Sequence, residues 1–259
     1  MTDMSQQERL ILSGVELLFR FWPASPAFTL MTQEADVGHI IEILDAFIRV
    51  CRVLPQPAVT LGINATLQKT PALYPHPRCE MRKFLLASGS YDFSLENVFT
   101  SSQVPAIIVL GLVRSQACAG DYSKNPFRFE HMNLSSLNVE IDGKPARKPA
   151  MKFQFDDATI KSSYLDGFES LYEGWPDSIG RDDPSDFVGI SRLEWATDYS
   201  IFSFKLTQGG GKHFLPVIPM GNLRIYGTFS EALPENTTLV LYSRFPSILT
   251  IDRSRRVQV

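Results

Sequence analysis

The sequence predicts an all-β protein, a sandwich or a barrel, on the strength of two observations. Segments with an apolar side chain at every second position recur along the 259 residues, which is the pattern of strands that bury one face. Residues that favour turns, mainly Gly, Pro, Asn and Asp, separate these segments. Hydrophobic residues make up 44% of the chain and charged residues 20%, so the chain has enough apolar surface to close a large core.

Four of the predicted strands have apolar side chains that alternate with polar ones. These strands are residues 15–21, 137–141, 223–229 and 239–245. Asp142 and Gly143 follow the second of them, and this pair is typical of a hairpin turn. Two further strands are predicted at residues 105–113, which are apolar on both faces, and at residues 199–206.

Residues 40–53 fit two structures. Ile40, Leu44, Phe47 and Cys51 have helical spacing, whereas Leu44, Ala46, Ile48 and Val50 have strand spacing. Periodicity alone therefore leaves this segment open.

One helix is predicted at residues 159–172, as an insertion between strands. Its apolar side chains form one stripe: Ile160, Tyr164, Phe168 and Leu171. Asp157 is the candidate N-cap, and Gly174 follows the helix. Residues 173–192 are rich in Gly, Pro and Asp and have no period, so we expect a long loop. No change of composition divides the chain, so residues 1–259 are expected to form one domain.

The sequence contains no pattern typical of a catalytic, cofactor or metal site. The four histidines lie far apart, and no H-x-H or H-E-x-x-H pairing occurs. The acidic residues between Asp177 and Asp186 lack the spacing of an EF-hand loop. Residues 209–212 lack the first Gly and the final Ser or Thr of a phosphate-binding loop. We therefore expect no catalysis, no cofactor and no metal. An enzyme of the cupin type ranks third, behind the two non-enzymatic interpretations given below, because the clustered His and carboxylate ligands of such an enzyme are missing.

Charge and cysteine content limit the cellular context. The net charge of −3 does not favour nucleic-acid binding, apart from a weak contact through the basic residues 253–256. The three cysteines are far apart in the sequence, which favours a reducing compartment. The polar residues 1–8 do not resemble a secretion signal, and the longest apolar run, residues 104–113, is too short to span a bilayer. We expect an intracellular protein with no membrane partner.

One long stretch of sequence is specific enough to suggest a family. Residues 111–113 read GLV and residues 120–131 read GDYSKNPFRFEH, and both are similar to the pattern G-L-V…G-x-Y-x-K-N-P-F-x-F-x-H. Shorter phrases occur in the same order at residues 8–17 (ERLILSGVEL), 27–31 (AFTLM), 69–75 (KTPALYP), 139–144 (VEIDGK), 189–192 (GISR), 221–225 (GNLRI) and 251–257 (IDRSRRV). Over nearly its whole length the chain thus resembles the major capsid proteins of adintoviruses and of the related Maverick/Polinton elements.

The resemblance implies a fold and a role. The fold would be a jelly roll, two facing four-stranded antiparallel sheets, with residues 40–53 as a strand. The family resembles double jelly rolls, and here only seven residues precede the phrase at residues 8–17, so the chain corresponds to the C-terminal roll. The role would be structural, in the virion, by self-assembly in closed symmetry with a trimer as the first guess. The gene would be viral or an endogenous virus-derived element, and a separate N-terminal roll is a candidate partner.

Assembly contacts are expected in the loop 120–131 and the tail 251–259, and the alternative is that both segments only complete the roll. The candidate residues are Tyr122, Asn125, Phe127, Phe129, Arg253 and Arg256. Within the loop, Asn125 would start a turn, and Phe127 and Phe129 alternate with Arg128 as in a restarting strand. The rival interpretation is a domesticated β-sandwich binding module that holds a protein or carbohydrate on residues 173–192. Trp175 and Trp195 favour it slightly, because exposed aromatic rings can stack on ligands, although Trp in a sandwich is more often a core residue.

Overall fold

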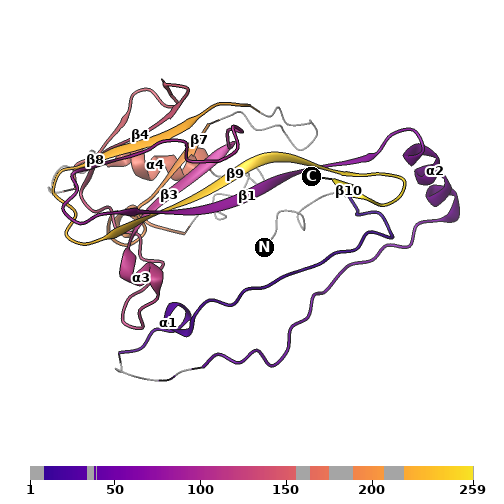
Figure 1. The fold of residues 1–259 in the computed structure, drawn as a ribbon, viewed down its shortest axis with the longest axis horizontal. Helices are drawn as coiled ribbons and strands as arrows, with labels where there is room; N and C mark the ends of the chain where they lie inside the picture. Colours follow the sequence, from indigo (N-terminus) through magenta and orange to yellow (C-terminus); the bar gives the residue numbers. More distant parts are fainter. Residues whose placement is uncertain are drawn as a thin grey trace.

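The computed structural model describes residues 9–33, 38, 40–155, 164–174, 189–206 and 219–258. Most of the regular structure is antiparallel strand, arranged in two sheets that face each other (Figure 1). The all-β sandwich predicted from the alternating segments is confirmed.

The first sheet has the strand order β1-β9-β3-β7, with β10 also paired to β9. Its strands are β1 (Ala72–Leu86), β3 (Ile107–Arg114), β7 (Ile201–Lys205), β9 (Thr237–Ile251) and β10 (Val257–Gln258). The second sheet has the order β2-β8-β4-β5, with β6 also paired to β4. Its strands are β2 (Asp92–Leu95), β4 (Leu134–Ile141), β5 (Lys144–Pro145), β6 (Met151–Lys152) and β8 (Leu223–Phe229).

This strand order is that of a jelly roll. From β1 to β4, and again from β6 to β9, each strand lies in the sheet opposite to that of the strand before it. Strands β1, β3, β7 and β9 thus belong to the first sheet, and β2, β4, β5, β6 and β8 belong to the second. The long crossovers place the first and last long strands, β1 and β9, side by side in continuous register from Ala72↔Ile251 to Leu86↔Thr237. The two four-stranded sheets expected from the resemblance are sheets of five strands among the described residues, because short strands are added at the edges. The roll is complete between Ala72 and Ile251.

The core lies between the two sheets. Along β8 the burial alternates residue by residue, with Leu223, Ile225 and Phe229 inside and Arg224 and Thr228 outside. Ile108, Leu241 and Phe245, from the opposite sheet, are fully buried, each with 0% of its surface exposed. Alternation therefore predicted both the strand and its buried face.

The predicted strands at residues 105–113, 137–141, 199–206, 223–229 and 239–245 are confirmed within a few residues at their ends. The hairpin turn is confirmed as well, since Asp142 and Gly143 both have positive φ, at 49° and 73°, as a tight two-residue turn requires. The strand expected from Phe127 to Phe129 is wrong, because the chain turns there and only Phe129 makes an isolated bridge, to Tyr199.

Five helices accompany the sheets among the described residues, and four of them were not predicted. They are α1 (Pro26–Thr29), α2 (Pro57–Leu67), α3 (Ser115–Ala119), α4 (Leu165–Gly174) and α5 (Arg192–Thr197). The helix predicted at residues 159–172 corresponds to α4, which starts at Leu165 and runs to Gly174; residues 157 and 159–163 lie outside the described part. The loop predicted at residues 173–192 is described only at its ends.

Helix α4 covers the edge of the first sheet. The backbone N–H of Ser203, on the edge strand β7, donates a hydrogen bond to the buried Ser170 Oγ of α4 at 3.0 Å. Trp195 of α5 is fully buried beside α4, and its ring lies 6.3 Å from Phe168 and 5.4 Å from Phe202. The described part of the predicted stripe, Tyr164, Phe168 and Leu171, therefore faces the core, and Ile160 lies outside the described residues. Helix α4 thus covers this sheet edge.

The strands β1 and β9 continue beyond the sandwich as a two-stranded ribbon (Figure 1). Strand β3 pairs with β9 only up to Arg244, so residues 245–251 of β9 have β1 as their long neighbour. A small cluster of Tyr74, Leu249 and Ile251, with Ile11, Leu12 and Val15 packed against it, stabilises the ribbon.

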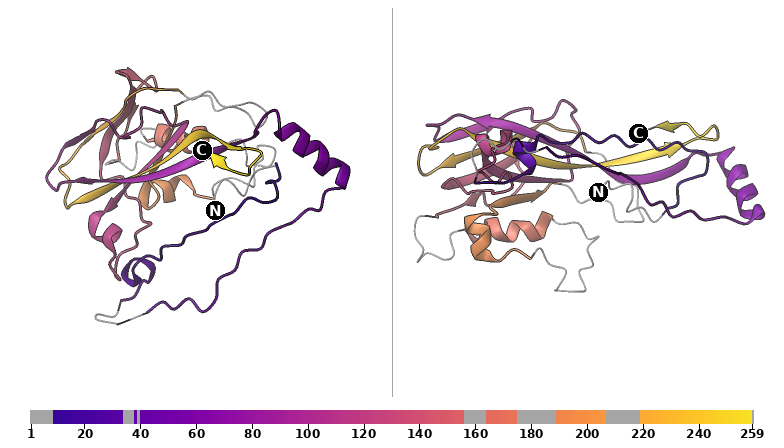
Figure 2. Two further views of the ribbon diagram at one scale, coloured as in Figure 1. Left: turned by 45° about the vertical axis from the view of Figure 1, so that its right-hand side comes forward. Right: turned by 90° about the horizontal axis from the view of Figure 1, so that it is seen from below.

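The described residues from 9 to 56, called the N-terminal arm below, lie outside the roll (Figure 2). The strand predicted at residues 15–21 is wrong, and so is the strand that the resemblance implied at residues 40–53, since neither segment is in a helix or strand. The physical reason is that all strand positions of the roll are filled by residues 72–251, so these segments have no described strand beside them.

Candidate assembly surfaces

The loop 120–131 follows α3 and folds back on short local hydrogen bonds. Asn125 Oδ1 accepts from the backbone N–H of Phe127 at 2.9 Å, which is the turn expected at Asn125. Asp121 Oδ1 accepts from Ser123 Oγ at 2.6 Å and from its backbone N–H at 2.8 Å. These bonds stabilise the carboxylate and hold the pKa of Asp121 below its ordinary value. The loop is thus shaped by its own side chains.

A group of ion pairs fixes the end of this loop to the sandwich. Arg114 Nε and Nη2 lie 3.1–3.2 Å from the carboxylate of Glu130, and Arg114 Nη1 lies 2.5 Å from Glu235 Oε1. The hydrogen bonds to Glu130 raise the pKa of the Arg114 guanidinium above its ordinary value, so the charge is permanent. Arg128 Nε donates to Asp198 Oδ1 at 2.6 Å.

Phe129 packs inside the protein. Its ring lies against Gly111 of β3, where a Cβ atom would come within 2.5 Å of the ring. Its N–H donates to Asp198 O at 2.8 Å, and its carbonyl accepts from Ser200 N at 2.9 Å. The structure therefore gives Phe129 a packing role within one chain.

Tyr122 and Phe127 contact the N-terminal arm. The Phe127 ring, 62% exposed, meets Phe28 edge to face at 5.8 Å between centroids. The Tyr122 carbonyl accepts from the Thr32 N–H at 2.8 Å. The structure thus brings three of the six candidate residues, Tyr122, Asn125 and Phe127, to one exposed loop beside α1.

Arg253 and Arg256 lie in the turn between β9 and β10, at the far end of the ribbon (Figure 1). Asp252 Oδ1 orders this turn by accepting from Ser254 Oγ at 2.7 Å and from Arg256 N at 2.9 Å. These bonds lower the pKa of Asp252, the bond from Ser254 having the largest effect. Both arginines are exposed, and the structure does not bring them together with the loop 120–131.

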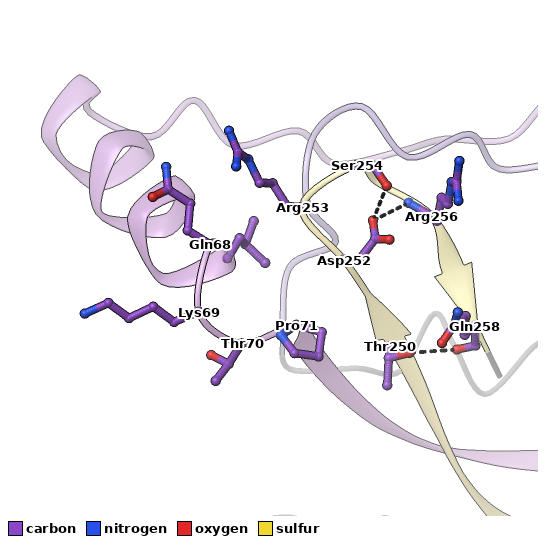
Figure 3. Close-up of a pocket in the computed structure, with 11 residues that line it drawn as sticks. Gln68, Lys69, Thr70, Pro71, Thr250, Asp252, Arg253, Ser254, Arg256 and Gln258 are labelled. Atoms are coloured by element: carbon purple, nitrogen blue, oxygen red, sulfur yellow. Dashed lines mark hydrogen bonds between the residues drawn. The ribbon is translucent and has the colours of Figure 1, made fainter.

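An open pocket of about 500 Å³ lies beside this turn, between β9, β10 and the end of α2. Lys69, Arg253 and Arg256 line it, and Figure 3 shows that their side chains extend in different directions. The cations therefore do not converge on one bound anion. Sequence reasoning missed Lys69, which only the fold of α2 places near the tail.

Most of the exposed large apolar side chains among the described residues lie on the N-terminal arm. Every residue of 16–24 and of 40–54, the two segments called the free spans below, is exposed. Large apolar side chains on them include Leu18, Phe21, Trp22, Ile40, Leu44, Phe47 and Leu54, each with more than two thirds of its surface accessible. Alternation predicted residues 15–21, with Phe21 among them, to be a strand with one face buried, whereas periodicity left residues 40–53 open and only the resemblance made them a strand.

The residues named for ligand binding, metal binding and membrane insertion can be located only in part. Trp195 is fully buried, so it is no exposed contact for a ligand, and residues 175–188 lie outside the described part. Within the described ranges, no three His, Cys, Asp or Glu side chains gather in a way that would hold a metal. Among the helices that are described, none has the length and apolar character needed to cross a bilayer.

Comparison with known proteins gives one curated relative and several structures. No family model matches the chain. An uncharacterised protein of Caenorhabditis elegans is 24% identical over 257 residues, which is 98% of this chain and 60% of the relative. The chain thus spans about three fifths of the length of the relative it matches.

Solved structures that align with the chain include viral capsids and virophage particles. The PBCV-1 virus capsid aligns at a TM-score of 0.42 and 10% identity, covering 77% of this chain and 54% of the other. The Sputnik virophage aligns at 0.41 and 13% identity, covering 73% and 39%. The mavirus major capsid protein aligns at 0.35 and 10% identity, covering 73% and 41%.

Proposed function

We propose that this chain is a structural capsid protein, viral or derived from an endogenous virus, that works by self-assembly and not by catalysis. The observation that carries the proposal is a jelly roll between Ala72 and Ile251 whose loop 120–131 presents the exposed ring of Phe127. Jelly rolls occur in capsid, lectin and cupin domains, and of these an assembling subunit is the one that needs large apolar surfaces for its neighbours. The sequence phrases that resemble adintovirus and Maverick/Polinton capsid proteins support the same class.

Assembly would place the chain in the virion, built from copies of itself. A trimer is the first expectation, because closed rotational symmetry satisfies every copy equally. Other capsid proteins, including a separate N-terminal roll, are proposed partners. The exposed Arg253 and Arg256 support at most a weak contact with nucleic acid.

The loop 120–131 supplies the proposed contact between copies. Phe127 stands out of it with 62% of its surface accessible, which leaves one face of the ring free for a neighbour after the contact with Phe28. Asn125 holds the backbone of Phe127 in place, so the ring is presented in a fixed position.

Sedimentation velocity at rising protein concentration tests the proposal. The wild-type chain is expected to form trimers or larger species, and Phe127→Ser is expected to weaken this association. Leu193→Ser is the matched control, because Leu193 is 72% exposed and lies outside the loop. Association that is equally strong in both variants would remove the loop from the interface, and a monomer at every concentration would contradict the proposed function.

A further inference from the structure

The two free spans have the side-chain pattern of β-strands although they are in no sheet. In residues 16–24, Leu17, Phe19 and Phe21 alternate with Glu16 and Arg20. In residues 40–54, apolar side chains are exposed at both odd and even positions. Leu18 and Trp22 lie on the opposite face of the first span, beside Glu16 and Arg20, so both spans have apolar side chains on both faces.

Hydrogen bonds and packing contacts join the arm and α2 to the rest of the chain before the first span, between the two spans and beyond the second. Near the first span, the Tyr74 hydroxyl donates to Leu10 O at 3.1 Å, and Val15 packs against the ribbon. Between the spans, Thr32 N donates to Tyr122 O at 2.8 Å. After the second span, Arg255 Nη2 donates to Asn64 Oδ1 of α2 at 3.2 Å. The fold thus fixes where the arm starts and ends, and it presents the spans as two extended segments (Figure 2).

A second copy of the chain does not fit as the cover. Its roll is filled by residues 72–251, and its core side chains, such as Ile108, Ile225 and Leu241, are already buried. Adding a strand to an outer edge of this roll would cover one face of residues 40–54 at most, because the facing sheet does not extend there. A strand with two apolar faces requires a position between layers of another sheet structure.

We propose that residues 16–24 and 40–54 insert as two strands into an incomplete β-sandwich of a different domain, and that this domain is the partner of the arm. The inference rests on the proposed function and specifies one of its contacts. Strand addition gives the free backbone groups hydrogen bonds, and the partner's apolar face buries the side chains. About two fifths of the C. elegans relative lies outside the match, which provides chain length for such a domain.

Hydrogen exchange in the wild-type chain is the first test. We expect the amides of residues 40–54 to exchange as fast as those of an unstructured chain at every protein concentration, while the amides of β9 stay protected. Protection of the spans that rises with concentration would assign them to a second copy, and protection at all concentrations would assign them to this chain's own roll. Either result would overturn the inference.

A pair of isoleucine variants checks the same point by stability. Ile48 is 49% exposed on the second span, and Ile251 is 1% exposed in β9. Ile48→Asp is expected to leave the midpoint of urea unfolding unchanged, whereas Ile251→Asp is expected to lower it strongly. An equal fall in both variants would mean that the span packs on this roll, which contradicts the inference.

Cross-linking of the full-length C. elegans relative tests the partner itself. Light and heavy isotope-labelled copies are mixed, so that links within one chain differ in mass from links between copies. We expect positions aligned with residues 16–24 and 40–54 to link to the part of the relative outside the match. Links confined to the matched part would overturn the inference. Self-association is read separately by sedimentation, so the inference and the proposed function can fail independently.

Discussion

At the scale of single residues, the contact between Gly111 and Phe129 decides how the loop 120–131 is attached. A Cβ atom at position 111 would lie 2.5 Å from the Phe129 ring, which leaves no room without moving the loop. Gly111→Ala is expected to destabilise the fold by about 1–3 kcal/mol, as overpacked substitutions do. Urea unfolding measures this change.

A double variant isolates the contact. In a Phe129→Leu background, the same Gly111→Ala change is expected to cost less, because the ring that it meets is gone. Strictly additive effects would mean that the ring does not limit position 111.

Asp252 gives a pH-dependent prediction. Hydrogen bonds from Ser254 and Arg256 lower its folded pKa, so its contribution to stability is present above the unfolded pKa and is lost as pH falls through the folded one. We expect the carboxyl carbon, followed by NMR, to titrate below the ordinary value of 3.8. Ser254→Ala should raise the midpoint toward that value, and an unchanged midpoint would contradict the assigned cause.

Residue chemistry predicted local turns better than long-range contacts. Asp142 and Gly143 form their turn with positive φ because the dipeptide itself favours that backbone. The packing of Phe129 on Gly111 and the proximity of Lys69 to Arg253 depend on strands far apart in sequence, which no local pattern reports.

At the scale of elements, Trp195 joins α4 and α5 to the edge strand β7. It is fully buried, and its Nε1 donates to Ile201 O at 2.8 Å. Trp195→Ala is expected to lower the free energy of unfolding by about 3–5 kcal/mol. Leu193→Ala on the same helix is the control, with a change of about 0.5 kcal/mol or less. If Trp195→Ala lowered the free energy of unfolding as little as Leu193→Ala does, the helices would not be part of the cooperative fold.

The ribbon of β1 and β9 depends on the start of the arm. Tyr74 is buried there, and burial raises the pKa of its hydroxyl, which donates to Leu10 O. Tyr74→Phe is expected to destabilise the protein by about 0.5–1.5 kcal/mol in urea unfolding. The exposed Tyr91 provides the control variant Tyr91→Phe, and equal effects would contradict the assigned bond.

Alternation identified strands only where a partner strand exists. Residues 223–229 and 15–21 have the same apolar period, yet the first pairs with β2 and β4 while the second is in no sheet. A period of two reports which side chains seek burial, but pairing depends on which strand positions remain open. Strand β1 shows the converse case: it has a partner strand, but Pro75 and Pro77 disrupt its alternation, so the sequence did not predict it. Strand β2 was also missed.

At the scale of the whole molecule, the roll and the arm have different requirements. The roll buries its own core between Ala72 and Ile251, whereas the arm leaves its large apolar side chains in solvent. The apolar surface of the arm is unfavourable in water, so the arm is expected to associate with the partner domain proposed above, whereas self-association is expected through the loop 120–131. The fold class was predictable from sequence, but the separation of arm and roll appears only in the structure.

The mass of the purified chain in solution, measured by light scattering across protein concentration, tests the central claim most directly. We expect trimers or larger assemblies whose fraction rises with concentration. Negative-stain images should show regular particles among the largest species. A strict monomer at every concentration and salt condition would contradict the assembly function.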